Sequence, residues 1–207
     1  MTTAGQNNAA LLYGLVLAGG KSQRMGHDKG LIQWHGKEQQ YYIADLLKNV
    51  CDDVYISCRA EQVQDITASY KALPDTIDCK GPLAGILSAF ERSPEAAWLV
   101  VACDLPLMDE STLRYLITNR DSSKIATTFK SPFDGLPEPL ITIWEPASIP
   151  ILKAAVVDGF SCPRKILIRN EQRVNILTPP NGDALLNANT PEDAEQVRRL
   201  LNTHQNT

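Results

Sequence analysis

The chain has 207 residues, 43% of them hydrophobic, which is enough for one well-buried domain. Its five cysteines form no C-x-x-C pair, and the odd number favours a reducing compartment over a secreted disulfide framework. The formal net charge of −4 provides no overall field toward nucleic acid or an anionic membrane, so neither is expected as a partner. Residues 9–20 are mostly apolar, but no basic stretch precedes them and Lys21 and Arg24 follow at once, so they predict neither a signal peptide nor a membrane span, and we expect a cytoplasmic protein.

The first predicted elements form a strand, loop, helix and strand unit. We expect residues 1–10 to be a flexible extension and residues 11–207 to be the single domain. Residues 13–17 read as a buried strand that ends in a glycine-rich loop. Ile43, Leu46, Leu47 and Val50 then repeat at helical spacing, and residues 54–57 read as the next strand. This order favours a parallel sheet.

The same alternation continues to the end of the chain. We expect a helix over residues 82–92, a strand over 98–102, and then a helix that carries Leu113, Leu116 and Ile117 and is capped by Asp109 or Ser111. Strands are expected over residues 125–129 and 140–144, followed by a helix near 149–157. The last two elements are a basic helix capped by Ser161 and a helix over residues 191–201 that begins after Thr190. The alternation predicts a three-layer α/β domain.

The segment from Leu17 to Lys29, LAGGKSQRMGHDK, places two adjacent glycines and three basic side chains directly after the first strand. Glycines let successive backbone N–H groups approach a polyphosphate, and nearby cations favour such a ligand. A Walker loop would need glycine where Leu15 stands, and no G-x-G-x-x-G occurs. We interpret the segment as a phosphate-binding loop of another kind, with a plain turn as the alternative.

Asp104 follows the apolar run over residues 98–102, within Cys103-Asp104-Leu105-Pro106. In open α/β sheets ligands gather beyond the carboxyl ends of the strands, where both the glycine loop and Asp104 are expected. Mg²⁺ is usually held by one or two carboxylates together with phosphate oxygens, which favours a metal role for Asp104. An aspartate that merely forms a turn before proline is the alternative.

Four segments in this order, LAGGKSQRMGHDKG, GPLAG, CDLP and LNANTPED, resemble the molybdenum cofactor guanylyltransferases over about residues 13–200. The resemblance implies a three-layer, Rossmann-like nucleotidyltransferase fold with a mostly parallel central sheet. It also implies transfer of GMP from Mg-GTP to molybdopterin, with release of pyrophosphate. Such chemistry needs positioning and charge neutralisation more than a covalent nucleophile.

The resemblance also assigns roles to individual residues. The backbone of Leu17, Ala18, Gly19 and Gly20 and the side chain of Asp75 are expected to bind the nucleotide, and Arg24 and Lys29 to contact the phosphates that leave. Asp104 is expected to bind Mg²⁺. Asn187 and Asn189 are expected to make metal-proximal or pterin-side contacts. Arg24, Lys29 and Asp104 are thereby the expected catalytic residues.

Three further points concern the base and the acceptor. The family often has a base-contacting asparagine near Ser57, whereas this chain reads Ile56-Ser57-Cys58-Arg59, so the choice of base stays open. The segment 135–140 resembles a loop that some members place beside the acceptor, with a proline-rich strand entry as the alternative. Arg164, Lys165 and Arg169 are candidate contacts for the acceptor phosphate, or else a solvated basic face.

Two other functions remain open at this point: cytidylyl or other nucleotidyl transfer on the same fold, and a nucleotide-binding regulatory protein without catalysis. The expected small-molecule partners are GTP and molybdopterin. Transient contact with other molybdenum cofactor biosynthesis proteins or with apo-molybdoenzymes is expected from a monomer or weak oligomer.

Overall fold

The computed structural model describes residues 10–18 and 29–204. Nearly all of the predicted N-terminal extension lies outside these residues, as do Gly19, Gly20 and Arg24 of the predicted phosphate loop. The backbone of Lys29 is described, but its side chain is not.

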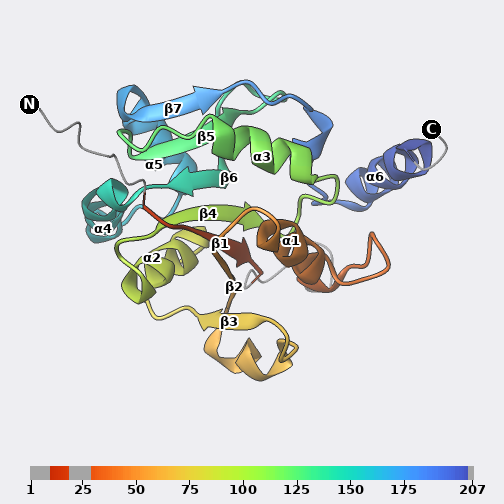
Figure 1. Ribbon diagram of the computed structural model, residues 1–207, viewed down its shortest axis with the longest axis horizontal. Helices are drawn as coiled ribbons and strands as arrows, with labels where there is room; N and C mark the ends of the chain where they lie inside the picture. The colour runs from red at the N-terminus through yellow and green to blue at the C-terminus, as the bar shows by residue number, and fades with distance from the viewer. Residues whose placement is uncertain (1–9, 19–28, 205–207) are drawn as a thin grey trace, which may run out of the picture.

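Within the described ranges the strands form one seven-stranded sheet in the order β3-β2-β1-β4-β6-β5-β7 (Figure 1). The strands are β1 Leu12–Leu17, β2 Asp53–Cys58, β3 Lys71–Pro74, β4 Ala97–Ala102, β5 Ala126–Lys130, β6 Pro137–Trp144 and β7 Val174–Leu177. Only β6 runs against its neighbours β4 and β5, and the other described pairs are parallel. The predicted mostly parallel sheet is confirmed.

Helices cover both faces of this sheet. They are α1 Gln39–Lys48, α2 Pro82–Arg92, α3 Glu110–Thr118, α4 Ile149–Val157, α5 Pro163–Arg169 and α6 Pro191–His204, with short 3-10 turns η1 Lys29–Leu31, η2 Ala60–Asp65, η3 Pro146–Ser148, η4 Glu171–Arg173 and η5 Asp183–Leu185. Helices α1 and α3 pack on one face, and α2, α4 and α5 on the other. The structure therefore confirms the predicted three layers.

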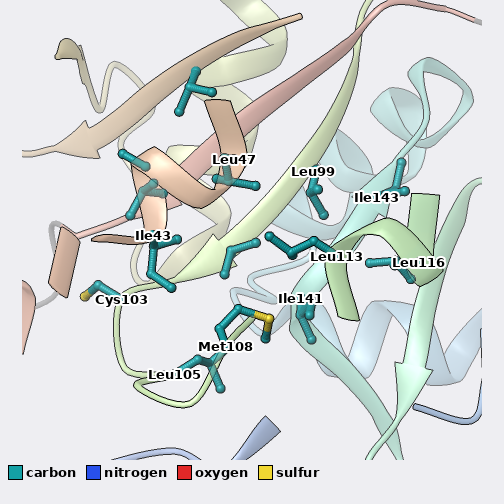
Figure 2. Close-up of a cluster of buried hydrophobic side chains, with 14 of the residues drawn as sticks. Ile43, Leu47, Leu99, Cys103, Leu105, Met108, Leu113, Leu116, Ile141 and Ile143 are labelled. Atoms are coloured by element: carbon teal, nitrogen blue, oxygen red, sulfur yellow. The ribbon is translucent and has the colours of Figure 1, made fainter. Parts of the chain in front are cut away.

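The strand sequences explain why both faces need cover. In β4, Leu99 and Val101 point into one core while Trp98 and Val100 point into the other, and all are buried. A central strand that is apolar on both faces is stable only between two layers that cover it. Figure 2 shows the first core, where Leu99 of β4 lies among side chains of α1, α3 and β6 (Ile43, Leu47, Leu113, Leu116, Ile141 and Ile143).

The helix caps differ in part from those expected. Asp109, not Ser111, caps α3, because its carboxylate accepts a hydrogen bond from the Thr112 backbone N–H at 2.7 Å. Thr190 caps α6 as predicted, accepting from the Asp193 N–H at 3.1 Å. The prediction of Ser161 as the cap of α5 is wrong: Cys162 occupies that position without a side-chain bond. Proline at the start of α5 removes one N–H that would otherwise need a partner.

Some strands and boundaries of the structure differ from those predicted. Strands β3 and β7 were not expected, β6 begins at Pro137 instead of residue 140, and α6 continues to His204. Within residues 10–18 and 29–204, every helix is too short or too polar to cross a bilayer.

Candidate functional site

A cavity of about 740 Å³ opens at the carboxyl edge of the sheet. Strands β1, β2 and β4 end at it, and α2 begins at it. Its lining consists of Leu17, Ala18, Ser57, Arg59, Ala60, Glu61, Asp75, Ile77, Cys79, Lys80, Gly81, Pro82, Ala84, Gly85, Ala102, Cys103, Asp104 and Leu140. Ligands of open α/β sheets bind in such a crevice.

The parallel ladder continues past the strand ends and brings the start of the predicted phosphate loop next to Asp104. The Ala18 N–H donates to the Ser57 carbonyl at 3.2 Å, and the Cys103 N–H donates to the Leu17 carbonyl at 3.3 Å. Leu17 and Ala18 thus lie between the ends of β2 and β4 and line the cavity, as does Asp104. These three predicted site residues share one site.

Ser57 and Asp75 meet at the ends of β2 and β3, next to Ala18. In the parallel pairing of β2 with β3, Ser57 faces Leu73 and Cys58 faces Pro74, so Asp75 emerges beside the end of β2. The Ser57 hydroxyl donates to Asp75 Oδ1 at 2.8 Å. Burial raises the pKa of the Asp75 carboxyl, while the bond from Ser57 and the charge of Arg59 act in the opposite direction.

The first turn of α2 forms the floor of the cavity. Gly81 has φ = +76°, a conformation that disfavours residues with a Cβ, and Pro82 starts the helix without an N–H that would need an acceptor. Unpaired N–H groups and the helix dipole make such a terminus favourable for an anion. The GPLAG segment therefore supplies the turn and the helix start that line this part of the cavity.

Asp104 and the predicted asparagines are also brought together. The Ala188 N–H donates to the Asp104 carbonyl at 3.0 Å, which places Asn187 and Asn189 on either side of the residue bonded to Asp104. In the described ranges no three His, Cys, Asp or Glu side chains cluster around a possible metal position. Asp104 lines the main cavity, whereas neither asparagine is among its lining residues. A single carboxylate fits Mg²⁺, which retains waters and phosphate oxygens, better than it fits a metal that needs a complete protein cage.

Several cavity residues were not predicted from the sequence. Arg59 and Glu61 line the cavity from the segment after β2, with Arg59 Nε donating to Glu61 Oε1 at 2.8 Å. Cys79 and Lys80 line it just before α2. Burial raises the pKa of the Cys79 thiol, with Asp75 and Asp78 adding to the rise. The position of Arg59 directly after a strand was the signal that could have identified it.

The three basic residues of α5 separate into two groups. Arg164 bridges the β5–β6 connection, with Nη1 2.6 Å from Asp134 Oδ2 and Nη2 3.1 Å from Glu138 Oε1. Lys165 and Arg169 line a different cavity of about 310 Å³ between α4 and α5. Most of the segment 135–140 is not a loop: residues 137–140 belong to β6, as the alternative of a proline-rich strand entry predicted, and Leu140 lines the main cavity.

A mostly parallel sheet between two helical layers, with a strand-end aspartate and a helix N-terminus at one cavity, is typical of α/β proteins that bind nucleotides. The family model described as the MobA-like NTP transferase domain matches residues 14–174. The chain belongs to this family.

Two relatives illustrate the likeness in sequence. The chain is 36% identical to the molybdenum cofactor biosynthesis bifunctional protein of Synechocystis over 187 residues, which are 90% of this chain and 53% of that protein. It therefore spans about half the length of that relative. It is 33% identical to the molybdenum cofactor guanylyltransferase of Pseudomonas putida KT2440, over 86% of this chain and 93% of the relative.

Solved structures show the same fold. Molybdopterin-guanine dinucleotide biosynthesis protein A from Archaeoglobus fulgidus superposes with a TM-score of 0.75 at 23% identity, over 92% of this chain and 99% of that one. A CMP:2-keto-3-deoxy-manno-octonic acid synthetase complexed with CTP superposes with a TM-score of 0.68 at 13% identity, over 94% and 100%. The predicted Rossmann-like nucleotidyltransferase fold is thereby confirmed.

Proposed function

We propose that this chain transfers GMP from Mg-GTP to molybdopterin, forming molybdopterin guanine dinucleotide and releasing pyrophosphate. The observation that carries the proposal is the cavity in which Ala18, Asp75, the α2 N-terminus and Asp104 meet. The guanylyltransferase named among the relatives matches the chain over 93% of its own length, which supports the same activity here.

The donor nucleotide binds between the ends of β1 and β2 and the start of α2. The backbone of Leu17, Ala18, Gly19 and Gly20 holds the nucleotide in this proposal, and Asp75 accepts a hydrogen bond from the nucleoside. Arg24 and Lys29 offset the charge on the two phosphates that leave. The carboxyl end of a sheet beside a helix N-terminus is a favourable place for such an anion.

The reaction joins two phosphates. An oxygen of the molybdopterin phosphate forms a bond to the α-phosphorus of GTP, while the bond from that phosphorus to the α–β bridging oxygen breaks. Pyrophosphate leaves with the bonding electron pair. Because two anions must approach, the side chains act by positioning the reactants in line and by neutralising charge.

Asp104, with Asn187 and Asn189 close by, would hold the magnesium ion. A bound Mg²⁺ supplies charge neutralisation on the phosphate oxygens. Asp75 follows β3 and Asp104 follows β4, and β2 and β1 lie between these two strands in the sheet. The two carboxylates therefore line different parts of the cavity. The carboxylates are thus assigned separate tasks, one toward the metal and one toward the nucleoside.

The acceptor enters from the side of Leu140 and the β5–β6 connection. Arg164 lies there, held by Asp134 and Glu138, and is the proposed contact for the acceptor phosphate. Lys165 and Arg169 line the separate cavity between α4 and α5, so we leave them out of the acceptor site.

We further propose that the protein works in the cytoplasm as one domain over residues 11–207. A monomer or weak oligomer that contacts apo-molybdoenzymes or other cofactor biosynthesis proteins transiently would suit a soluble biosynthetic step. Gel filtration of the purified chain with and without molybdopterin tests the oligomeric part of this proposal.

Cytidylyl transfer is the second candidate, because Ser57 stands where the family often has a base-contacting asparagine. Turnover separates the two functions. Purified protein is supplied with molybdopterin, Mg²⁺ and GTP, CTP, ATP or UTP in turn, and pyrophosphate release is followed. We expect rapid release with GTP; a clear preference for CTP would overturn the guanylyl assignment.

A further inference from the structure

Ser57 is buried at the end of β2, with 2% of its surface exposed. Its hydroxyl donates to Asp75 Oδ1 at 2.8 Å. A serine hydroxyl has only one hydrogen to donate. While this bond exists, Ser57 is therefore unable to donate to a nucleobase, as an asparagine amide at the same position could.

Gly85 of α2 faces the same hydroxyl. A Cβ at this position would lie 2.4 Å from Ser57 Oγ and 2.9 Å from Leu17 Cδ2, both closer than real side chains pack. Glycine is otherwise unfavourable inside a helix, because it loses more conformational freedom than alanine. The absence of a side chain at residue 85 is what leaves space for the Ser57 hydroxyl beneath Asp75.

We propose that Ser57 is a positioning residue whose hydroxyl fixes the Asp75 carboxylate in the cavity wall for the nucleotide, and that Gly85 provides the space for this contact. The inference rests on the proposed function, in which Asp75 binds the nucleoside. A carboxylate has about four lone-pair directions, so Asp75 can accept from Ser57 and still accept from a ligand N–H or O–H.

The contact also bears on the charge of Asp75. Burial opposes ionisation of this carboxyl, whereas the Ser57 bond and Arg59 favour it. The other titratable groups that line this cavity are Arg59, Glu61, Cys79, Lys80, Cys103 and Asp104. The Cys58 thiol, whose pKa rises to about 11, lies next to Ser57 in β2. Loss of the hydroxyl removes one of the two influences that lower the pKa of Asp75.

The first test is Ser57→Ala, with binding of GTP and Mg²⁺ measured by calorimetry across pH 5 to 8. Loss of a hydrogen bond to a charged group predicts GTP affinity about tenfold weaker at neutral pH. The pH below which binding weakens should also move upward, because Asp75 then takes up a proton more readily. Titration of the GTP phosphates is common to both proteins and cancels in the comparison.

Ser123→Ala is the matched control. Ser123 also donates to an aspartate, Asp121 Oδ1 at 2.6 Å, but both residues lie in an exposed turn away from the cavity. This variant should bind GTP like the wild type at every pH. Unchanged affinity and unchanged pH dependence in Ser57→Ala would overturn the positioning role.

Gly85→Ala provides a second, independent test. In the wild-type background the new methyl collides with Ser57 Oγ, whereas in the Ser57→Ala background that oxygen is gone. Only the contacts with Leu17 Cδ2 at 2.9 Å and with the Cβ of residue 57 at 3.2 Å then remain close, and the end of the flexible Leu17 side chain can shift. We expect the loss of GTP affinity caused by Gly85→Ala to be several-fold smaller in the second background. Equal losses in the two backgrounds would contradict the proposal.

Different results would refute the proposed function and the positioning role of Ser57. Wild-type protein that binds no GTP at any pH would refute the proposed function itself. Wild-type protein that binds GTP, with variants at residues 57 and 85 that bind it equally well, would refute only the positioning role of Ser57 and Gly85.

Discussion

Replacing Glu145 by glutamine should destabilise the protein strongly, because it breaks a buried ion pair. Arg120 and Glu145 have side chains only 10% and 3% exposed. Arg120 Nε and Nη2 donate to the two carboxylate oxygens at 2.6 and 2.9 Å, and Nη1 donates to the Ala10 carbonyl at 3.1 Å. Glu145→Gln keeps the shape but leaves the guanidinium buried without its counter-charge.

Breaking such a pair from one side costs about 3–5 kcal/mol. For a chain of this size each kcal/mol lowers the unfolding midpoint by about 2–4 °C, so a fall of roughly 6–20 °C is expected. Thermal and urea unfolding followed by circular dichroism would measure it. The denaturant slope should stay unchanged, because the surface exposed on unfolding is the same.

The exposed pair of α3 supplies the control. Arg114 Nη2 lies 2.7 Å from Glu110 Oε1, but these side chains are 58% and 37% exposed, so Glu110→Gln should leave the unfolding midpoint nearly unchanged. Replacing Arg120 and Glu145 together by methionine should cost less than Glu145→Gln alone, since no charge stays buried. Equal midpoints for Glu145→Gln and Glu110→Gln would refute the reasoning.

Three further predictions concern the site. Asp104→Ala should abolish pyrophosphate release while changing GTP affinity only a few-fold, and unimpaired turnover would refute the metal role of this residue. Lys29→Ala should weaken both GTP binding and turnover by about tenfold or more, through loss of charge beside the phosphates, and wild-type kinetics would count against it. Asp75→Asn should weaken GTP binding yet raise the unfolding midpoint of the ligand-free protein at pH 7. Burial raises the pKa of Asp75 in the folded protein, so the wild type loses stability as the pH rises through that pKa and the carboxyl ionises. The higher unfolding midpoint of Asp75→Asn should therefore disappear below the ordinary aspartate range, where the wild-type carboxyl is protonated in both the folded and the unfolded protein.

Most of the layered fold could be predicted because the central strands are long and apolar. Strand β4 reads AWLVVA and is buried throughout, and α4 occupies the residues that its apolar run suggested. The two missed strands, β3 and β7, have four residues each and lie at the sheet edges. Short edge strands such as KALP carry charge and proline in place of an apolar run, so periodicity does not reveal them.

Because β3 was not predicted, the contacts of Asp75 in the site could not be predicted either. Asp75 could be matched to a family position, but its bond to Ser57 depends on β3 pairing with β2. The distance between Gly85 and Ser57 depends on how α2 packs over the strand ends. Such contacts join residues far apart in the chain and are set by tertiary packing. By contrast, the place of Asp104 at the end of β4 was readable from the run before it.

A crystal of the protein soaked with GTP and Mg²⁺ tests the central claim most directly. The proposal predicts guanosine phosphate density in the cavity of about 740 Å³, with the nucleoside beside Asp75 and the phosphates toward Ala18 and the start of α2. It also predicts the metal within about 2.0–2.1 Å of an Asp104 carboxylate oxygen. Nucleotide bound in the α4–α5 cavity, or a metal held away from Asp104, would contradict the account.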